Sequence, residues 1–259
     1  MRLLRSLAMC FLMYSRIPAP KVEWKDENMA YAMCFFPLVG LIEGVLLYLW
    51  YLLCRWLGIG PLLFAAGAVG LPIAVNGGIH LDGFCDCSDA LASHQTRERK
   101  LEIMKDSSAG AFAVIACGVY LILFFALWGE EWAALTPRLM GCLALGPVLS
   151  RALSGFGVVT FRNARTGGLL ATFSRAADSG RVRVVMILWY LAALAGAVAL
   201  SPWPGTALVL GALATFLFYR VSAYRQFGGI TGDTAGWFLQ LCELVSLAAA
   251  VLAGKLALL

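Results

Sequence analysis

Seven apolar runs constrain the fold of this chain most, because each has about the length that a helix needs to cross the ~30 Å apolar core of a bilayer. The residues are 61% hydrophobic and 14% charged, whereas a soluble domain carries about 25% charged residues. The sequence therefore predicts an all-α, polytopic membrane bundle of about seven transmembrane helices, forming one domain over 1–259, with a lipid bilayer around it and no nucleic-acid partner. The runs lie at 30–54, 61–79, 108–128, 138–158, 184–200, 205–222 and 236–254.

The positive charge of the chain is concentrated in alternate connections between these runs. Of the 20 lysine and arginine residues, 16 lie in or next to the segments 1–29, 80–107, 159–183 and 223–235. Because cytoplasmic loops carry an excess of lysine and arginine, we expect these four segments and the N-terminus in the cytoplasm, and the C-terminus outside. The expected location is the cell inner (cytoplasmic) membrane. The sequence leaves a homo-oligomer open.

Three aspartates follow the second apolar run at a helical spacing. Asp82, Asp86 and Asp89 would fall within roughly 60° of one another on a helix. Like charges on one helix face repel each other, and a bound cation removes that cost. Mg²⁺ takes carboxylate oxygens and keeps positions open for substrate phosphates. The aspartates therefore predict a Mg²⁺ site beside a membrane, of the kind used in phosphoryl transfer.

Other polar residues lie in or beside the predicted spans. Glu43, Arg151 and Glu243 are functional candidates because an unpaired ionisable group at membrane depth is costly. Structural pairing of these groups explains them equally well. His80 precedes the aspartates, where it either contacts a ligand or acts as a base, or is only hydrogen-bonded within the fold.

Two further polar clusters border predicted spans. In Lys105-Asp106-Ser107, either a helix N-terminus and the lysine hold a phosphate, or the aspartate and serine cap the third span. The glycine-rich segment 227–236 contains Thr231 and Asp233, and its backbone N–H groups are able to surround an anion. A flexible connection is the alternative for this segment. The basic segment 162–183 suits either an anionic substrate or anionic lipid.

Five motifs, in order, make the chain similar to a known family. They are Tyr14–Pro20, Phe36–Gly40, the His80–Asp89 segment, Met104–Ser107 and Gly228–Asp233. With its length and hydropathy, the chain resembles the cobalamin synthases, also called adenosylcobinamide-GDP ribazoletransferases.

The resemblance implies a reaction and a set of roles. Enzymes of this family join adenosylcobinamide-GDP, a corrinoid nucleotide, to α-ribazole or its 5′-phosphate, and release GMP. By resemblance, one or two Mg²⁺ ions would be held by Asp82, Asp86 and Asp89, and Asp233 would complete the metal shell or accept the proton of the attacking hydroxyl. The expected substrate contacts are His80, Lys105, Asp106, Ser107, Thr231, Glu43 and Glu243.

Two other functions remain as alternatives at this point. A CDP-alcohol phosphotransferase also uses aspartates at a membrane edge, but its first aspartate would fall on Ile79, and Cys87 would replace its arginine. An ion-coupled transporter would use Glu43, Arg151 and Glu243 as a relay at the midplane, although such proteins often carry internal repeats.

Overall fold

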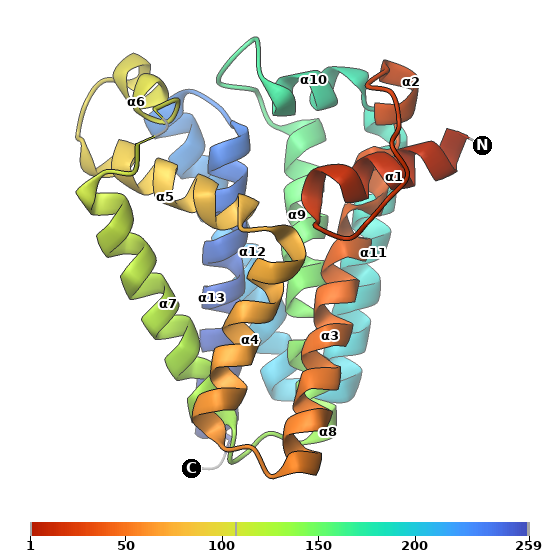
Figure 1. Cartoon of the computed structure of the whole chain (residues 1–259), viewed down its shortest axis with the longest axis vertical. Coiled ribbons are helices and arrows are strands. Elements are labelled where there is room, and N and C mark those ends of the chain that lie inside the picture. Colours follow the sequence, from red (N-terminus) through yellow and green to blue (C-terminus); the bar gives the residue numbers. More distant parts are fainter. Residues whose placement is uncertain (1, 107, 258–259) are drawn as a thin grey trace.

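The computed structural model describes residues 2–106 and 108–257. Six of its helices are long and apolar enough to cross a membrane. The pair α4 and α5 is a seventh candidate and is bent by 96°. This confirms the predicted all-α membrane bundle (Figure 1). The six are α3 (Phe36–Leu57, with α2, Asp26–Met29, and the 3₁₀ helix η1, Ala32–Phe35, before it), α7 (Ala111–Glu131), the pair α8 (Pro137–Leu143) and α9 (Gly146–Thr160), α11 (Ser179–Leu200), α12 (Pro202–Phe227) and α13 (Gly232–Leu256).

The second apolar run ends earlier than the sequence predicts. Helix α4 (Pro61–Asn76) has 16 residues, or about 24 Å at 1.5 Å per residue. Gly77 and Gly78 then adopt φ values of 69° and 80°, a left-handed conformation that only glycine adopts readily. The chain therefore turns sharply, and α5 (Ile79–Ala92) leaves α4 at 96°. Helix α5, which carries the three aspartates, runs across one end of the bundle instead of through it (Figure 1).

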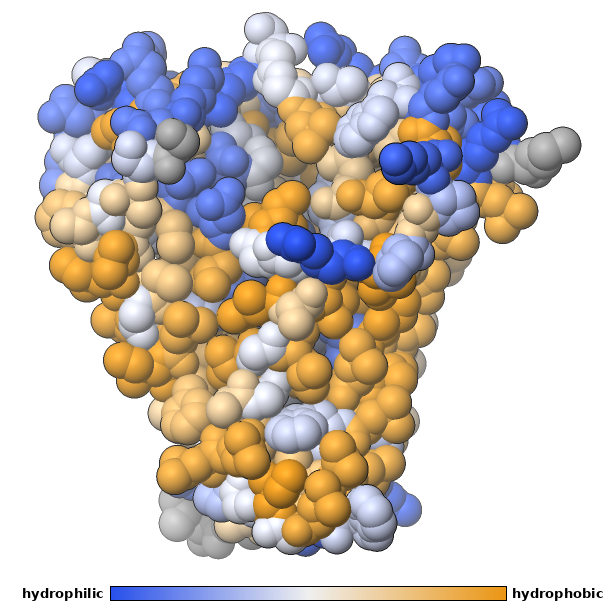
Figure 2. Space-filling view, in the orientation of Figure 1, coloured by the Kyte–Doolittle hydropathy of each residue, from blue (hydrophilic) through white to orange (hydrophobic). Residues whose placement is uncertain are grey.

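The four basic segments lie at the same end of the bundle as α5. This end carries α1 (Arg2–Tyr14), α2, α6 (Arg97–Ile103) and α10 (Leu169–Ala176), whereas α13 finishes at the opposite end (Figure 1). Figure 2 shows hydrophilic residues gathered there above a broad apolar belt. Helix α1 has 13 residues, about 20 Å, so it is too short to span the bilayer and lies across this end.

Helix α9 forms the centre of the bundle and is buried over most of its length. Two glycines allow α3 to pack closely against α9 and the short connection that precedes it. A Cβ on Gly40 would clash with the carbonyl oxygen of Pro147 in α9, and a Cβ on Gly44 would clash with that of Ala144 in the connection. Close approach through small residues is the usual way in which membrane helices pack. The contact brings polar side chains of α3 and α9 together within the membrane-spanning part.

Candidate active site

A cavity of about 230 Å³ lies at the basic end of the bundle. Its walls come from α1, η1, α3, α5, α9, the segment between α9 and α10, α10 (Leu169–Ala176) itself, and the end of the loop before α13 with the start of that helix. Four of the residues singled out from the sequence line it, namely His80, Asp82, Thr231 and Asp233. The structure thus brings the start of α5 and the start of α13 to one site, although about 150 residues separate them in the chain.

Glycines allow α5 and α13 to meet at this cavity. A Cβ on Gly83 would lie 2.9 Å from the Cα of Asp233, and one on Gly236 would lie 2.9 Å from the carbonyl oxygen of His80. Both distances are too short for a real side chain, so only glycine fits at either position. This contact places the carboxylates of Asp82 and Asp233 on the wall of one cavity.

The start of α13 is fixed by hydrogen bonds. Thr231 Oγ1 accepts a hydrogen bond from the backbone N–H of Thr234, and Thr234 Oγ1 accepts one from the N–H of Thr231; this reciprocal arrangement is a capping box. The preceding Ile230 forms a parallel bridge with Asn163. The flexible connection that the sequence left open for 227–236 is therefore wrong for its second half.

Asp233 lies in the first turn of α13, next to a basic side chain. Nη1 of Arg165 is 3.8 Å from Oδ2 of Asp233, and Arg165 also donates a hydrogen bond to the carbonyl oxygen of Leu101. Arg165 lines the cavity. It is therefore the cationic side chain best placed to contact an anionic group there, a role that the sequence assigned to Lys105.

Asp86 lies one turn beyond Asp82 on α5, outside the six spans. Partial burial raises its pKa to about 6, and the neighbouring carboxylates of Asp82, Asp233 and Asp89 raise it in the same direction. The raised pKa of Asp86 thus means that several carboxylates lie close together here and that the ionised form of Asp86 is disfavoured. A bound cation would relieve this cost.

Asp89 has a structural role that the sequence did not reveal. Its Oδ2 accepts a hydrogen bond from the N–H of Gly110 at 2.5 Å, and its Oδ1 accepts one from the N–H of Ala113 at 2.8 Å. These N–H groups belong to the start of α7, where the first amides lack helical partners. Asp89 therefore caps α7 from a neighbouring helix. Its predicted role as a metal ligand stays a prediction.

The cap predicted from Lys105-Asp106-Ser107 is wrong, because α7 begins after Gly110 and is capped by Asp89. Asp106 instead accepts a hydrogen bond from the N–H of Ser108, which holds the pKa of this carboxyl below its usual range. Lys105 and Asp106 are exposed and do not line the cavity. Ser107 lies outside the described residues. The substrate contacts predicted for these three residues stay predictions.

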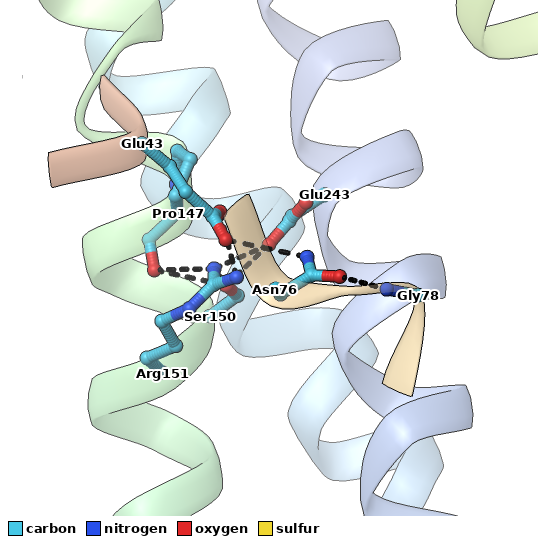
Figure 3. A network of polar contacts seen from close by, with 7 residues as sticks. All are labelled: Glu43, Asn76, Gly78, Pro147, Ser150, Arg151 and Glu243. Carbon is cyan, nitrogen blue, oxygen red and sulfur yellow. Dashed lines mark hydrogen bonds and ion pairs between the residues drawn. The ribbon is translucent and has the colours of Figure 1, made fainter. Parts of the chain in front are cut away.

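Glu43 and Glu243 share one guanidinium group within the bundle (Figure 3). Nη2 of Arg151 lies 2.7 Å from Oε2 of Glu43, and its Nη1 donates to Oε1 of Glu243 at 2.7 Å. All three side chains are at least 90% buried. Structural pairing, which the sequence left open, is thus the arrangement observed. Neither carboxylate lines the cavity, so their predicted substrate contacts stay predictions.

Asn76 connects this buried ionic group to α5 (Figure 3). Its Nδ2 donates to Oε1 of Glu43 at 3.3 Å, and its Oδ1 accepts from the N–H of Gly78 at 2.9 Å. The carbonyl oxygen of Gly78 then accepts from the N–H of Asp82 at 2.8 Å. The bend between α4 and α5, and with it the position of Asp82, is thus tied to Arg151 through Glu43 and Asn76.

The residues at the cavity fit a bound Mg²⁺. Among the described residues no three histidine, cysteine or acidic side chains already form a closed set of metal ligands. Mg²⁺ does not need such a set, because it is usually bound by one or two carboxylates together with substrate phosphates and waters. Asp82 and Asp233 at the cavity, with Asp86 nearby, supply oxygen ligands of that kind.

The bundle and its acidic cavity define a polytopic membrane protein with a carboxylate-lined site at its basic end. Comparison with known proteins identifies the family: the chain belongs to the cobalamin-5-phosphate synthases, whose family model matches residues 6–251. It is therefore an enzyme, and the CDP-alcohol phosphotransferase and transporter alternatives are set aside. No solved structure matches the chain.

Curated relatives match the chain over nearly its full length. An adenosylcobinamide-GDP ribazoletransferase of Lachnoclostridium phytofermentans is 43% identical, with 98% of this chain and 95% of the relative covered. The protein of the same name from Clostridium perfringens strain 13 is 34% identical, with 94% and 96% covered. That from Pseudomonas entomophila is also 34% identical, with 93% and 95% covered.

Proposed function

We propose that this protein is a Mg²⁺-dependent transferase that joins adenosylcobinamide-GDP to α-ribazole, or to its 5′-phosphate, and releases GMP. The names of the relatives supply the two substrates. The observation that carries the proposal is the cavity shared by Asp82 of α5 and Asp233 of α13, with Arg165 beside them. Carboxylates and a guanidinium at one site suit a pyrophosphate bound together with a divalent cation.

The reaction is a displacement at phosphorus. A ribose hydroxyl of α-ribazole attacks the phosphorus on the cobinamide side of the pyrophosphate. The bond from this phosphorus to the bridging oxygen breaks, and GMP departs with that oxygen. The hydroxyl proton goes to a nearby base, for which Asp233 is the candidate on the cavity wall. Such transfers depend mainly on positioning and on neutralising phosphate charge.

The side chains at the cavity divide these tasks. Asp82 and Asp86, with Asp89 as a further predicted ligand, would hold the Mg²⁺, which neutralises the phosphoryl oxygens when it is bound. Arg165, whose Nη1 lies 3.8 Å from Oδ2 of Asp233, contacts the departing phosphate. Arg151, Glu43 and Asn76 act at a distance by fixing the start of α5.

The proposed site opens on the cytoplasmic face of the inner membrane. Its walls belong to the end of the bundle that carries α1, α6 and α10, where most lysine and arginine residues lie. By the positive-inside rule this end faces the cytoplasm, where nucleotide-activated substrates are present.

GMP release by the detergent-purified protein tests the proposed function. With adenosylcobinamide-GDP, α-ribazole and Mg²⁺, we expect GMP and the cobalamin product in equal amounts. Excess EDTA should lower the rate by about a hundredfold or more, and added Mg²⁺ should restore it. A thermal unfolding transition shows that the purified protein is folded. If such protein releases no GMP with Mg²⁺, or releases GMP equally well in EDTA, the proposal is contradicted.

A further inference from the structure

Arg165 is held at the cavity by contacts with two helices. Its Nη1 lies 3.8 Å from Oδ2 of Asp233 in α13, and its Nη2 donates a hydrogen bond to the carbonyl oxygen of Leu101 in α6. The arginine lines the cavity, whereas none of the described residues 97–103 of α6 does so. One guanidinium group therefore connects the proposed active site to a helix that lies outside it.

The carbonyl group of Leu101 is free to accept this bond. The last carbonyl groups of a helix lack N–H partners within the helix, and Leu101 lies in the last turn of α6. The backbone N–H groups that follow α6 bond to the carbonyl oxygens on either side of it, which leaves the carbonyl oxygen of Leu101 to the arginine. Arginine side chains commonly bond to the last carbonyls of a helix in this way. The direction of the guanidinium thus depends on where α6 places Leu101.

Two cationic side chains of α6 bind the end of α12. Nζ of Lys100 donates a hydrogen bond to Oε1 of Gln226 at 2.6 Å, and Nε of Arg97 donates one to the carbonyl oxygen of Arg225 at 3.2 Å. Residues three apart lie on the same face of a helix, so this face is turned towards α12. Lys100 is 6% exposed, whereas Arg97 is exposed. Lys100 therefore makes the buried part of the attachment.

A buried lysine that is bonded to a neutral amide needs an explanation. Removing an ammonium group from water is costly, and an apolar pair of similar size is often at least as stable. Buried polar contacts, however, specify one arrangement of helices in some proteins. Lys100 directly precedes Leu101 in the chain. Its bond to Gln226 therefore fixes the position of the carbonyl group that holds Arg165.

The backbone beside Arg165 is fixed separately from the arginine side chain. The N–H of Ala164 donates to the carbonyl oxygen of Ile230 at 2.9 Å, and the N–H of Ile230 donates to that of Arg162 at 2.8 Å. These bonds attach the segment to the loop before α13. They do not direct the side chain of Arg165, because arginine is among the residues with the most rotamer freedom. Leu101 supplies that restraint, so α6 determines where the cation points.

We propose that α6 is a positioning element of the active site and that Lys100 is the residue through which it directs Arg165 at the pyrophosphate of adenosylcobinamide-GDP. The inference rests on the proposed function, in which Arg165 contacts the departing phosphate. Lys100 touches no substrate in this arrangement, because it does not line the cavity. Holding the guanidinium in place before the substrate binds lowers the entropic cost of binding. The loss of Lys100 should therefore weaken the binding of this substrate.

Equilibrium binding of adenosylcobinamide-GDP to the purified protein, with Mg²⁺ and without α-ribazole, tests the proposal before any turnover. Lys100→Met removes the donors, and we expect about threefold to tenfold weaker binding from the lost restraint on Arg165. Lys100→Met combined with Gln226→Leu leaves neither partner unpaired, so it should unfold at nearly the wild-type temperature and still bind weakly. Arg99→Met is the matched control, because Arg99 pairs with Glu102 on the exposed side of the same helix. Its affinity should equal that of wild type.

A double-mutant cycle shows whether Lys100 acts through Arg165. Arg165→Met removes the charged contact and should weaken binding about tenfold to a hundredfold. Adding Lys100→Met to Arg165→Met should change the affinity by less than about twofold, because the side chain that Lys100 directs is gone. Equal losses from Lys100→Met with and without Arg165 would overturn the proposal, as would wild-type affinity of either Lys100 variant or of Arg165→Met. Binding that shows this coupling, without any GMP release in the complete reaction, would contradict only the proposed function.

Discussion

Asp86→Ala and Asp82→Ala should each lower the rate of GMP release by about a thousandfold, because each removes a carboxylate that neutralises transition-state charge through the bound cation. Neither side chain forms a hydrogen bond or ion pair with another of the described residues. Their loss should therefore leave the thermal unfolding temperature of the detergent-purified protein nearly unchanged. Rates and unfolding temperatures of the two variants, measured on the same preparations, check this.

Two matched variants separate catalysis from structure. Asp89→Ala removes a cap that accepts two backbone N–H groups, so it should lower the free energy of unfolding by about 1–2 kcal/mol. Glu130→Ala affects an exposed pair with Lys255 at the other end of the bundle and should change neither quantity. A wild-type rate for Asp86→Ala, or an unfolding temperature lowered as far as in Asp89→Ala, would show that Asp86 does not act in the chemistry.

Arg151→Met should destabilise the protein more than any other single change discussed here. The substitution leaves Glu43 and Glu243 buried without a cation, and breaking a buried ion pair in this way costs about 3–5 kcal/mol. It also frees Asn76 and the bend between α4 and α5. We therefore expect a large fall in the thermal unfolding temperature and, in whatever folded protein remains, a slower release of GMP.

A compensated variant shows whether uncompensated charge is the cause. In Arg151→Met combined with Glu43→Gln and Glu243→Gln, no charge stays buried, and apolar or neutral replacements of a buried ion pair are often tolerated. Most of the lost stability should return. An unfolding temperature for Arg151→Met equal to that of wild type would contradict the structural role of the ionic group, and a triple variant as unstable as the single one would contradict the electrostatic explanation.

The fold was predictable because its signals are local. The length and hydrophobicity of each apolar run predict a membrane-spanning helix on their own. The arginines and lysines between the runs indicate which helix ends face the cytoplasm. The bend at Gly77 and Gly78 was not predicted, because glycines also occur inside membrane helices. Only the two consecutive left-handed conformations distinguish this pair.

The candidate site was predictable only in part, because its remaining contacts join distant parts of the chain. The spacing of Asp82 and Asp86 on α5 follows from helix geometry, but the use of Asp89 as a cap depends on where α7 begins. The place of Arg165 beside Asp233 likewise depends on how the segment after α9 meets the start of α13. A sequence pattern describes the face of one helix and not the neighbour that packs against it.

The role of Asn76 had a signal that could have been used. An asparagine followed by two glycines is a common way to end a helix and turn the chain, because asparagine side chains bond to the backbone two residues on. Asn76 does this with Gly78. Its second bond, to Glu43, depends on the packing of α3 and could not have been read from the local sequence.

Binding of Mn²⁺, a paramagnetic substitute for Mg²⁺, tests most directly the claim that the acidic cavity holds a divalent cation. Electron paramagnetic resonance of the purified protein with adenosylcobinamide-GDP, and without α-ribazole, measures bound Mn²⁺ before any turnover. We predict saturable binding that Mg²⁺ displaces and that Asp82→Asn and Asp86→Asn each weaken by about tenfold or more, while Glu130→Gln leaves it unchanged. No saturable binding to the wild-type protein, or equal binding by wild type and both aspartate variants, would contradict the account.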